Sequence, residues 1–280
     1  MDRETRVSLA AYRCLYPRAV ELGGITVLRA DAAPLNPMLN QIVGLGMDEP
    51  ATETALDAAL AAIGDDVSCY VAIHPGARPA ELVEWLSERG LEPGWGWMAF
   101  RRGLEDIPAP ATTLRLVRVG GAEAGAFGRI VASGYGLPDA AAPWAAGAHE
   151  AGWDCWLALD GDEPAAAAGV FVSEGVGYIG FAATLPEHRG KGGQSALLAE
   201  RIRHARAIGC DVLVTETGER RDDLPSSSYR NILRAGFTEV AVRANWLRQA
   251  RQAKDSKPAT SARGRLEDRR SLERDTRRCI

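Results

Sequence analysis

The stretch TLPEHRGKGGQSALL, Thr184–Leu198, places three glycines and two cations between an expected strand and an amphipathic helix. Glycine loses more chain entropy on folding than other residues, so a loop this rich in glycine indicates backbone that must approach something closely. The helix continues its apolar stripe through Ile202 and Ala205, and Gly209 stands where it should stop. The segment therefore predicts a strand, a glycine loop and a helix in direct succession.

A glycine loop between a strand and a helix is typical of an anion-binding site. The N–H groups of the first helical turn have no partners within the helix, and the helix dipole is positive at that end. Lys191 is the only lysine before residue 248, and its ammonium suits a phosphate. Two common phosphate loops are excluded: the Walker pattern G-x-x-x-x-G-K-[ST] is absent, and GKGGQS ends in serine where the dinucleotide fingerprint requires glycine.

Composition indicates a globular protein with room for two domains. The chain has 280 residues and 46% apolar content, and it contains no run of about 18 apolar residues that would cross a membrane. Its first residues lack the apolar core of a secretory signal, so we expect a cytoplasmic protein without membrane partners. The five cysteines are scattered without zinc-binding spacing, so we expect no metal site.

The C-terminal segment 248–280 differs from the rest of the chain in charge. It carries eleven Arg or Lys against five Asp or Glu, whereas the whole chain has a net charge of −4. With almost no apolar residues it is expected to be a basic disordered tail. Nucleic-acid binding through this tail is the weaker alternative, because no aromatic residues are interleaved for base stacking.

Strand and helix patterns alternate on both sides of a turn-rich hinge, RRGLEDIPAPATT, which ends at Thr113. We place one domain at residues 1–110 and a second at 111–247. The alternation predicts a mixed central sheet flanked by helices. WLSERGLEP and NILRAGFTE each end a helix at a glycine, which favours a degenerate internal duplication; chance similarity between two α/β units is the open alternative.

The segment LPEHRGKGGQSALL resembles the acetyl-coenzyme A loop P-x-x-R-G-x-G-x-G-x-x-L-L of the GCN5-related N-acetyltransferases (GNAT). Arg189 and Gly192 match that pattern, and Gln194 replaces its last glycine. YRNILRAGF is similar to the late helix of the family. The resemblance covers about half of the chain well and the first half weakly. It implies a GNAT-like α/β fold in tandem, with a degenerate N-terminal copy and acetyl-CoA as co-substrate.

The resemblance also implies the residues that hold the coenzyme. Main-chain groups on the strand would pair with the pantetheine arm, and the loop would cradle the pyrophosphate, with the side chain of Gln194 pointing away. The implied cofactor-binding residues are Ala182, Ala183, Thr184, Arg189, Gly190, Lys191, Gly192, Gly193, Gln194 and Ser195.

Acetyl transfer to an alkyl amine with a pKa of about 10.4 requires a free lone pair, which costs about 4.6 kcal/mol at pH 7. A general base and an acid for the leaving thiolate therefore help. The resemblance implies a glutamate base, for which Glu216 at the end of a strand is the candidate, and a tyrosine acid on the late helix. The usual tyrosine position is Ile232, so Tyr229 is the substitute. Trp144 and His149 lie in the segment that lines the acceptor pocket in the family. Structural roles are open alternatives for all of these side chains.

The leading hypothesis is an N-acetyltransferase that acts on a primary amine of a small molecule or a protein. The acidic body mildly favours a cationic acceptor. The alternative from another class is a non-catalytic acyl-CoA-binding or sensory module. A nucleic-acid partner is not expected, and a homodimer is left open.

Overall fold

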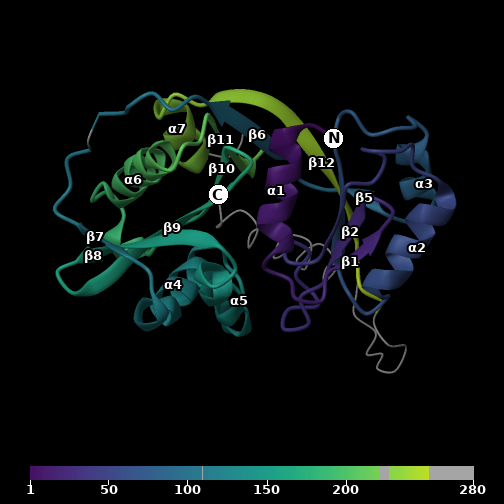
Figure 1. Ribbon diagram of the computed structural model, residues 1–280. Coiled ribbons are helices and arrows are strands. Elements are labelled where there is room, and N and C mark those ends of the chain that lie inside the picture. The colour runs from purple at the N-terminus through teal and green to yellow at the C-terminus, as the bar shows by residue number, and fades with distance from the viewer. Residues whose placement is uncertain (109, 221–226, 252–280) are drawn as a thin grey trace.

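The computed structural model describes residues 1–108, 110–220 and 227–251. This part of the chain forms a continuous mixed β-sheet with helices on both faces (Figure 1), which confirms the mixed α/β class predicted from the sequence. Within these ranges, every helix is too short or too polar to cross a bilayer.

The first half of the chain is a small sheet with helices α2 and α3 packed on its outer side (Figure 1). The Thr52 hydroxyl accepts a hydrogen bond from the Ala55 N–H at 3.1 Å and caps α2. The sequence patterns predict neither α1 nor the β1–β2 hairpin. The elements are α1 (Arg3–Arg13), β1 (Val20–Leu22), β2 (Ile25–Leu28), β3 (Gln41–Val43), α2 (Glu53–Ile63), β4 (Cys69–Ile73), α3 (Leu82–Glu88), β5 (Glu92–Pro93) and β6 (Trp97–Arg102).

The second half is a larger sheet with helices on both faces. Leu197 and Ile202 of α6 pack in the core on one face, and Phe127 and Val131 of α4 pack in the core on the other (Figure 1). The elements are β7 (Arg115–Arg118), α4 (Gly121–Gly134), α5 (Ala142–Ala146), β8 (Trp153–Asp160), β9 (Glu163–Ser173), β10 (Val176–Thr184), α6 (Gly193–Ala207), β11 (Val212–Gly218), α7 (Ser227–Arg234) and β12 (Thr238–Arg248).

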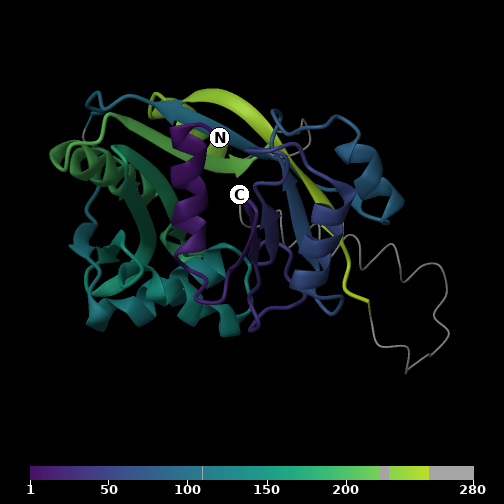
Figure 2. The same ribbon diagram turned by 45° about the vertical axis from the view of Figure 1, so that its right-hand side comes forward.

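The two halves exchange strands. β6 from the first half lies between β11 and β12, where Phe100 is opposite both Thr215 and Glu239. β12 pairs with β6 along residues 238–243 and with β4 along residues 244–248, so it runs from one half into the other (Figure 2). A register shift between Glu239 and Ala241 lets this one long strand bend and serve both sheets.

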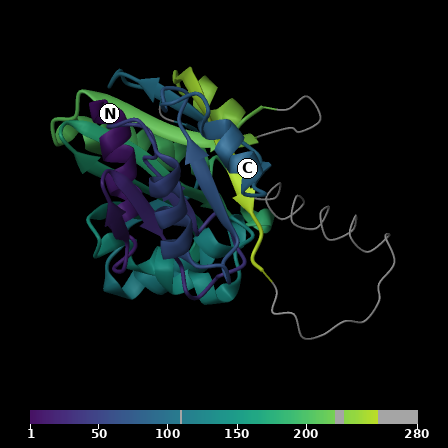
Figure 3. The same ribbon diagram turned by 90° about the vertical axis from the view of Figure 1, so that its right-hand side faces the viewer.

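The halves also share a hydrophobic core through α1. Val7 and Ala11 of α1 belong to the same buried cluster as Tyr178 and Val214 of the second half. The Trp153 indole N–H donates to the Ala11 carbonyl at 3.1 Å. Figure 3 shows α1 against the second-half sheet from the side. The domain boundary near residue 110 stays a prediction, because main-chain pairing and core packing both cross it.

The start of the expected basic tail is in contact with the first half. Arg248 ends β12 opposite Cys69, and its guanidinium donates to the Leu60 carbonyl at 3.1 Å. Arg251 forms an ion pair with Asp65 at 3.0 Å. Residues 252–280, and with them the rest of the tail prediction, lie outside the described residues.

We expect the chain to unfold in one cooperative transition, because strand exchange and the shared core couple the halves. A fragment of residues 111–251 lacks β6 and α1 and is expected not to fold alone. Urea unfolding followed by tryptophan fluorescence and by far-UV circular dichroism checks this. Two separate transitions, or a cooperatively folded fragment, would contradict it.

Candidate functional site

β10 and β11 are parallel neighbours that separate halfway along their length. They pair from Val176–Ile179 to Val212–Thr215, and the Thr215 hydroxyl donates to the Ile179 carbonyl at 2.8 Å. Beyond this point β11 continues beside β6, whereas β10 stays paired with β9. In the described part of the chain, the far end of β10 therefore has one edge without a neighbouring strand.

A bulge interrupts β10 where this open edge begins. Its register with β9 shifts between Gly180 and Ala183, and Phe181 has a φ of +56°, which is uncommon for a non-glycine residue. The Phe181 ring is buried 4.6 Å from the Trp153 ring, so packing holds the unusual backbone in place. The bulge leaves Ala182 exposed.

Main-chain directions after the bulge differ among the three residues predicted to hold pantetheine. The Leu185 N–H donates to the Ala165 carbonyl of β9 at 3.0 Å. Successive residues of a strand direct their main-chain groups to opposite edges, so Thr184 directs its groups away from β9. The Ala183 carbonyl, by contrast, accepts from the Gln194 side-chain amide at 2.6 Å. Thr184 and the exposed Ala182 are thus the better placed of the three.

The three loop glycines serve different purposes. Gly190 and Gly192 have φ values of +80° and +79°, which favour glycine. A Cβ on Gly190 would meet nothing within 4 Å, so this side of the loop is open. A Cβ on Gly192 would lie 2.8 Å from the Ala111 carbonyl oxygen, and one on Gly193 would lie 3.0 Å from Leu114. Of the three glycines, only Gly190 leaves room for a ligand. At Gly192 and Gly193 a larger side chain would collide with the chain itself.

The first turn of α6 is fastened to β10 by Gln194. Its amide donates to the Thr184 hydroxyl at 3.0 Å as well as to the Ala183 carbonyl. The side chain therefore points toward the strand. Arg189 and Ser195, on either side of the glycines, are exposed.

The loop carries two cations, Arg189 and Lys191, and one carboxylate, Glu187, with Asp160 beside it. Lys191 and His188 share one carboxylate, that of Asp160, which lies 3.1 Å from His188 Nδ1 and forms an ion pair with the Lys191 ammonium. Hydrogen bonds from Lys191 and then His188 hold the pKa of Asp160 below its ordinary value. Arg189 is exposed, so its guanidinium and the N–H groups of the first turn of α6 suit an anion.

A cavity of about 160 Å³ lies where β10 and β11 diverge and extends to the first half. The second half contributes Ile179, Ala182, Gln194 and Thr215 to its wall, among others. The sequence patterns give no sign of the first-half contribution, because those residues are distant in sequence and belong to no motif. They are Tyr12, Leu15, Met38, Leu39, Gln41 and Trp97.

Glu216 lines this cavity, as expected for a residue at the end of β11. Its carboxylate forms an ion pair with Arg243 at 2.9 Å, and the two side chains are 10% and 12% exposed. Beside them the Tyr178 hydroxyl donates to the Tyr12 hydroxyl at 2.7 Å. Burial, together with the charge of Glu216, raises the pKa of Tyr12 to about 12, so this phenol keeps its proton at neutral pH.

Tyr229, the candidate acid, points to Glu239 and not into the cavity. Its hydroxyl donates to Glu239 at 2.5 Å, and its ring packs edge-on against Phe100 at 4.9 Å. Burial and then the hydrogen bond to Glu239 raise the pKa of Tyr229 to about 12. Tyr229 is absent from the described cavity wall, so the structure does not bring it together with Glu216. The α7 residues that do line the cavity are Ser228, Asn231 and Ile232.

Of the two residues in the segment expected to line an acceptor pocket, Trp144 lines the cavity and His149 does not. Trp144 lines the cavity and packs against Phe181 at 5.6 Å. His149 bonds the Ala146 carbonyl through Nδ1 at 2.8 Å and is not part of the wall. In the described ranges, no three His, Cys, Asp or Glu side chains come together in a way that could hold a metal ion.

The corresponding place in the first half is filled by the chain itself. β3 and β4 are parallel like β10 and β11, with Gln41 opposite Tyr70. The Arg78 N–H donates to the Gly46 carbonyl at 3.0 Å, and the Arg78 carbonyl accepts from the Ala51 N–H at 2.7 Å. A main-chain segment around Arg78 therefore bonds the groups that follow β3 and precede α2.

Comparison with known proteins agrees with this geometry. Residues 133–224, which span β8–β11 and the glycine loop, match the model of the Acetyltransferase (GNAT) family. No curated protein matches the chain.

Several solved structures share the fold. A GCN5-related N-acetyltransferase from Kribbella flavida is 20% identical, with a TM-score of 0.60 over 88% of this chain and 96% of that one. A GCN5-related N-acetyltransferase from Sphaerobacter thermophilus is 16% identical, with a TM-score of 0.56 over 73% of this chain and 67% of that one. A tandem GNAT protein from the clavulanic acid biosynthesis pathway is 14% identical, with a TM-score of 0.54 over 89% and 88%. The likeness at these identities is one of fold.

Ser195→Glu should weaken coenzyme A binding roughly tenfold, because it puts a negative charge on the first turn of α6 beside the expected pyrophosphate. The fold should not suffer, since a carboxylate at a helix N-terminus is favourable and Ser195 is exposed. Calorimetry and thermal unfolding measure the two effects. Ser195→Gln is the matched control of similar size without charge. Equal affinity of both variants and the parent would rule out an anion site here.

Proposed function

We propose that the protein transfers the acetyl group of acetyl-CoA to a primary amine, because residues 133–224 match the model of the Acetyltransferase (GNAT) family. The observation that supports the proposal best is the open edge of β10 beside the glycine loop and the N-terminus of α6. Coenzyme A has amide groups along its pantetheine arm and a pyrophosphate farther on. The Thr184 main chain suits the pantetheine amides, and the loop with the α6 N-terminus suits the pyrophosphate.

The cavity supplies groups for the chemistry. In the reaction the amine nitrogen attacks the thioester carbon, the C–N bond forms, the C–S bond breaks, the amine loses a proton and the sulfur gains one. Glu216 is the carboxylate of the described cavity wall and is our candidate base. For Tyr229 to act as the acid, its hydroxyl would have to leave Glu239 and turn toward the cavity.

A non-catalytic acyl-CoA-binding module is the second candidate. It is favoured by Ile232, which lines the cavity at the position where the family commonly has its tyrosine. Coenzyme binding without transfer to any amine would support this candidate over the first.

Calorimetric titration with acetyl-CoA, followed by a thiol-release assay with a broad set of amines, tests the proposal. We expect micromolar binding of one acetyl-CoA per chain, because Arg78 already bonds the equivalent main-chain groups of the first half. We also expect thiol release that depends on added amine. Absence of binding would overturn the proposal, and two equivalents per chain would contradict the assignment of a single site.

Glu216→Gln should destabilise the fold by about 3–5 kcal/mol, because it leaves Arg243 charged, buried and unpaired. Loss of activity in this variant alone is therefore uninformative. The double variant Glu216→Gln/Arg243→Met removes both charges and should regain most of the stability. If Glu216 is the base, kcat/KM of the refolded double variant should still be roughly 100-fold below the parent. Parent-like activity would assign Glu216 a structural role only.

A further inference from the structure

The cavity lies between the two halves of the chain, and part of its wall is deeply buried. Leu39, Gln41 and Trp153 of its wall are each no more than 5% exposed. A lysine in a folded protein carries chain on both sides and needs an open groove to reach the thioester. A cavity of about 160 Å³ instead fits a small molecule.

Apolar side chains from both halves form most of the wall. Such a surface stabilises an apolar body by removing it from water and offers few partners for polar substituents. The residues concerned are Leu15, Met38 and Leu39 from the first half and Leu137, Trp144 and Phe181 from the second.

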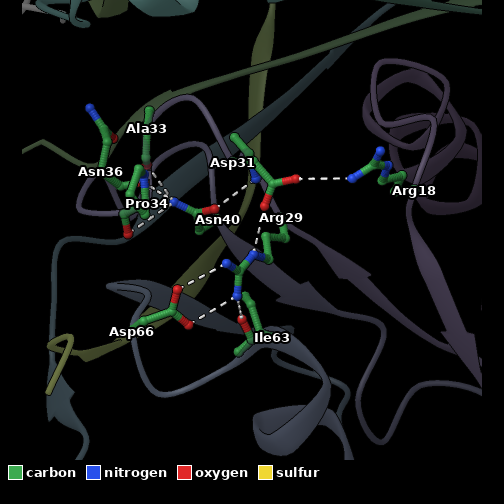
Figure 4. Close-up of polar contacts among 10 residues, drawn as sticks. Arg18, Arg29, Asp31, Ala33, Pro34, Asn36, Asn40, Ile63 and Asp66 are labelled. Atoms are coloured by element: carbon green, nitrogen blue, oxygen red, sulfur yellow. Dashed lines mark hydrogen bonds and ion pairs between the residues drawn. The ribbon is translucent and has the colours of Figure 1, made fainter.

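The first-half wall is held in place before any ligand arrives. Asn40 is fully buried, and its amide donates to the Ala33 and Asn36 carbonyls at 2.8 Å each (Figure 4). Its side-chain oxygen accepts from the Ala30 N–H at 2.8 Å. These bonds fix the loop 30–40 that carries Met38, so little ordering is needed on binding.

The cavity offers no spare negative charge in the described part of its wall. Glu216 is already paired with Arg243 at 2.9 Å. The other charged lining residue is the guanidinium of Arg201, which is 2% exposed and donates to the Leu197 and Gly180 carbonyls. A polyamine or another polycation would lack counter-charges here and would be repelled by Arg201.

From size, wall chemistry and charge, and on the basis of the proposed function, we propose that the acceptor is a small monoamine with an apolar body about as large as a benzene ring. The cavity measures about 160 Å³, and the part beside Ala182 lies where the pantetheine arm is expected, so the space left suits an acceptor no larger than a single ring.

An apolar cavity also favours the reactive form of such an amine. Burial disfavours the ammonium and lowers the pKa of the amine, so the free base with its lone pair is the form that binds. The amine proton passes to water or to Glu216 when the C–N bond forms, and the thiolate of coenzyme A takes up a proton. The bonds formed and broken are the same as in the acetyl transfer described above.

The test measures acetyl-CoA turnover with benzylamine, cyclohexylmethylamine, spermidine and a lysine-containing peptide under identical conditions. We expect kcat/KM for the first two to exceed that for spermidine and the peptide at least 100-fold. Met38→Phe fills the half-buried wall and should raise KM for benzylamine at least tenfold without changing acetyl-CoA affinity. Leu35→Phe is the matched control on the same loop, because Leu35 is 64% exposed and does not line the cavity.

The outcomes separate this inference from the proposed function. Faster turnover of spermidine or the peptide overturns the inference and leaves the acetyltransferase proposal standing. Binding of acetyl-CoA without turnover of any amine overturns both the inference and the transferase proposal. If hexanoyl-CoA binds more tightly than acetyl-CoA and Met38→Phe abolishes that preference, the cavity holds an acyl chain and the inference is wrong.

Discussion

The separation of β10 from β11 beyond Ile179 and Thr215 is the constraint on which the site depends. A parallel partner running the full length of β10 would bond the main chain of Thr184 and close the open edge. β6 prevents this, because it pairs with β11 on the other side and β11 follows it away from β10. The first half thus shapes the candidate coenzyme site through a strand, and the cavity wall through α1 and the loop 30–40.

Local chemistry made part of this site predictable. The glycine loop is visible in sequence because Gly190 and Gly192 need a backbone that other residues avoid. Glu216 is visible because it ends a buried strand. Tyr229 shows the limit of such reasoning. It lies three residues before Ile232 on the helix, so the two side chains differ in direction by only about 60°. That difference is enough to direct the Tyr229 hydroxyl to Glu239. Tyr12 and the other first-half wall residues were beyond reach, because only long-range packing brings them to the cavity.

The two halves use a similar α/β unit for different purposes. In the second half, the edge beside the parallel pair is open and faces a loop with room at Gly190. In the first half, Arg78 bonds the main chain at the corresponding place, and the segment MDEPAT offers no glycine. The sequence shows the tandem pattern only as a weak similarity. A repeated order of strands and helices also does not indicate which sheet edge stays open.

Strand exchange has a consequence for synthesis of the chain. β6 ends at Arg102, but the strands on both of its sides begin only at Val212 and Thr238. At 5–20 residues per second, a ribosome needs roughly ten seconds to make them, and β6 has neither partner during that time. Unpaired strands invite aggregation, and charge on them opposes it. Arg101 and Arg102, adjacent at the end of β6, give the waiting strand that protection before one of them is buried.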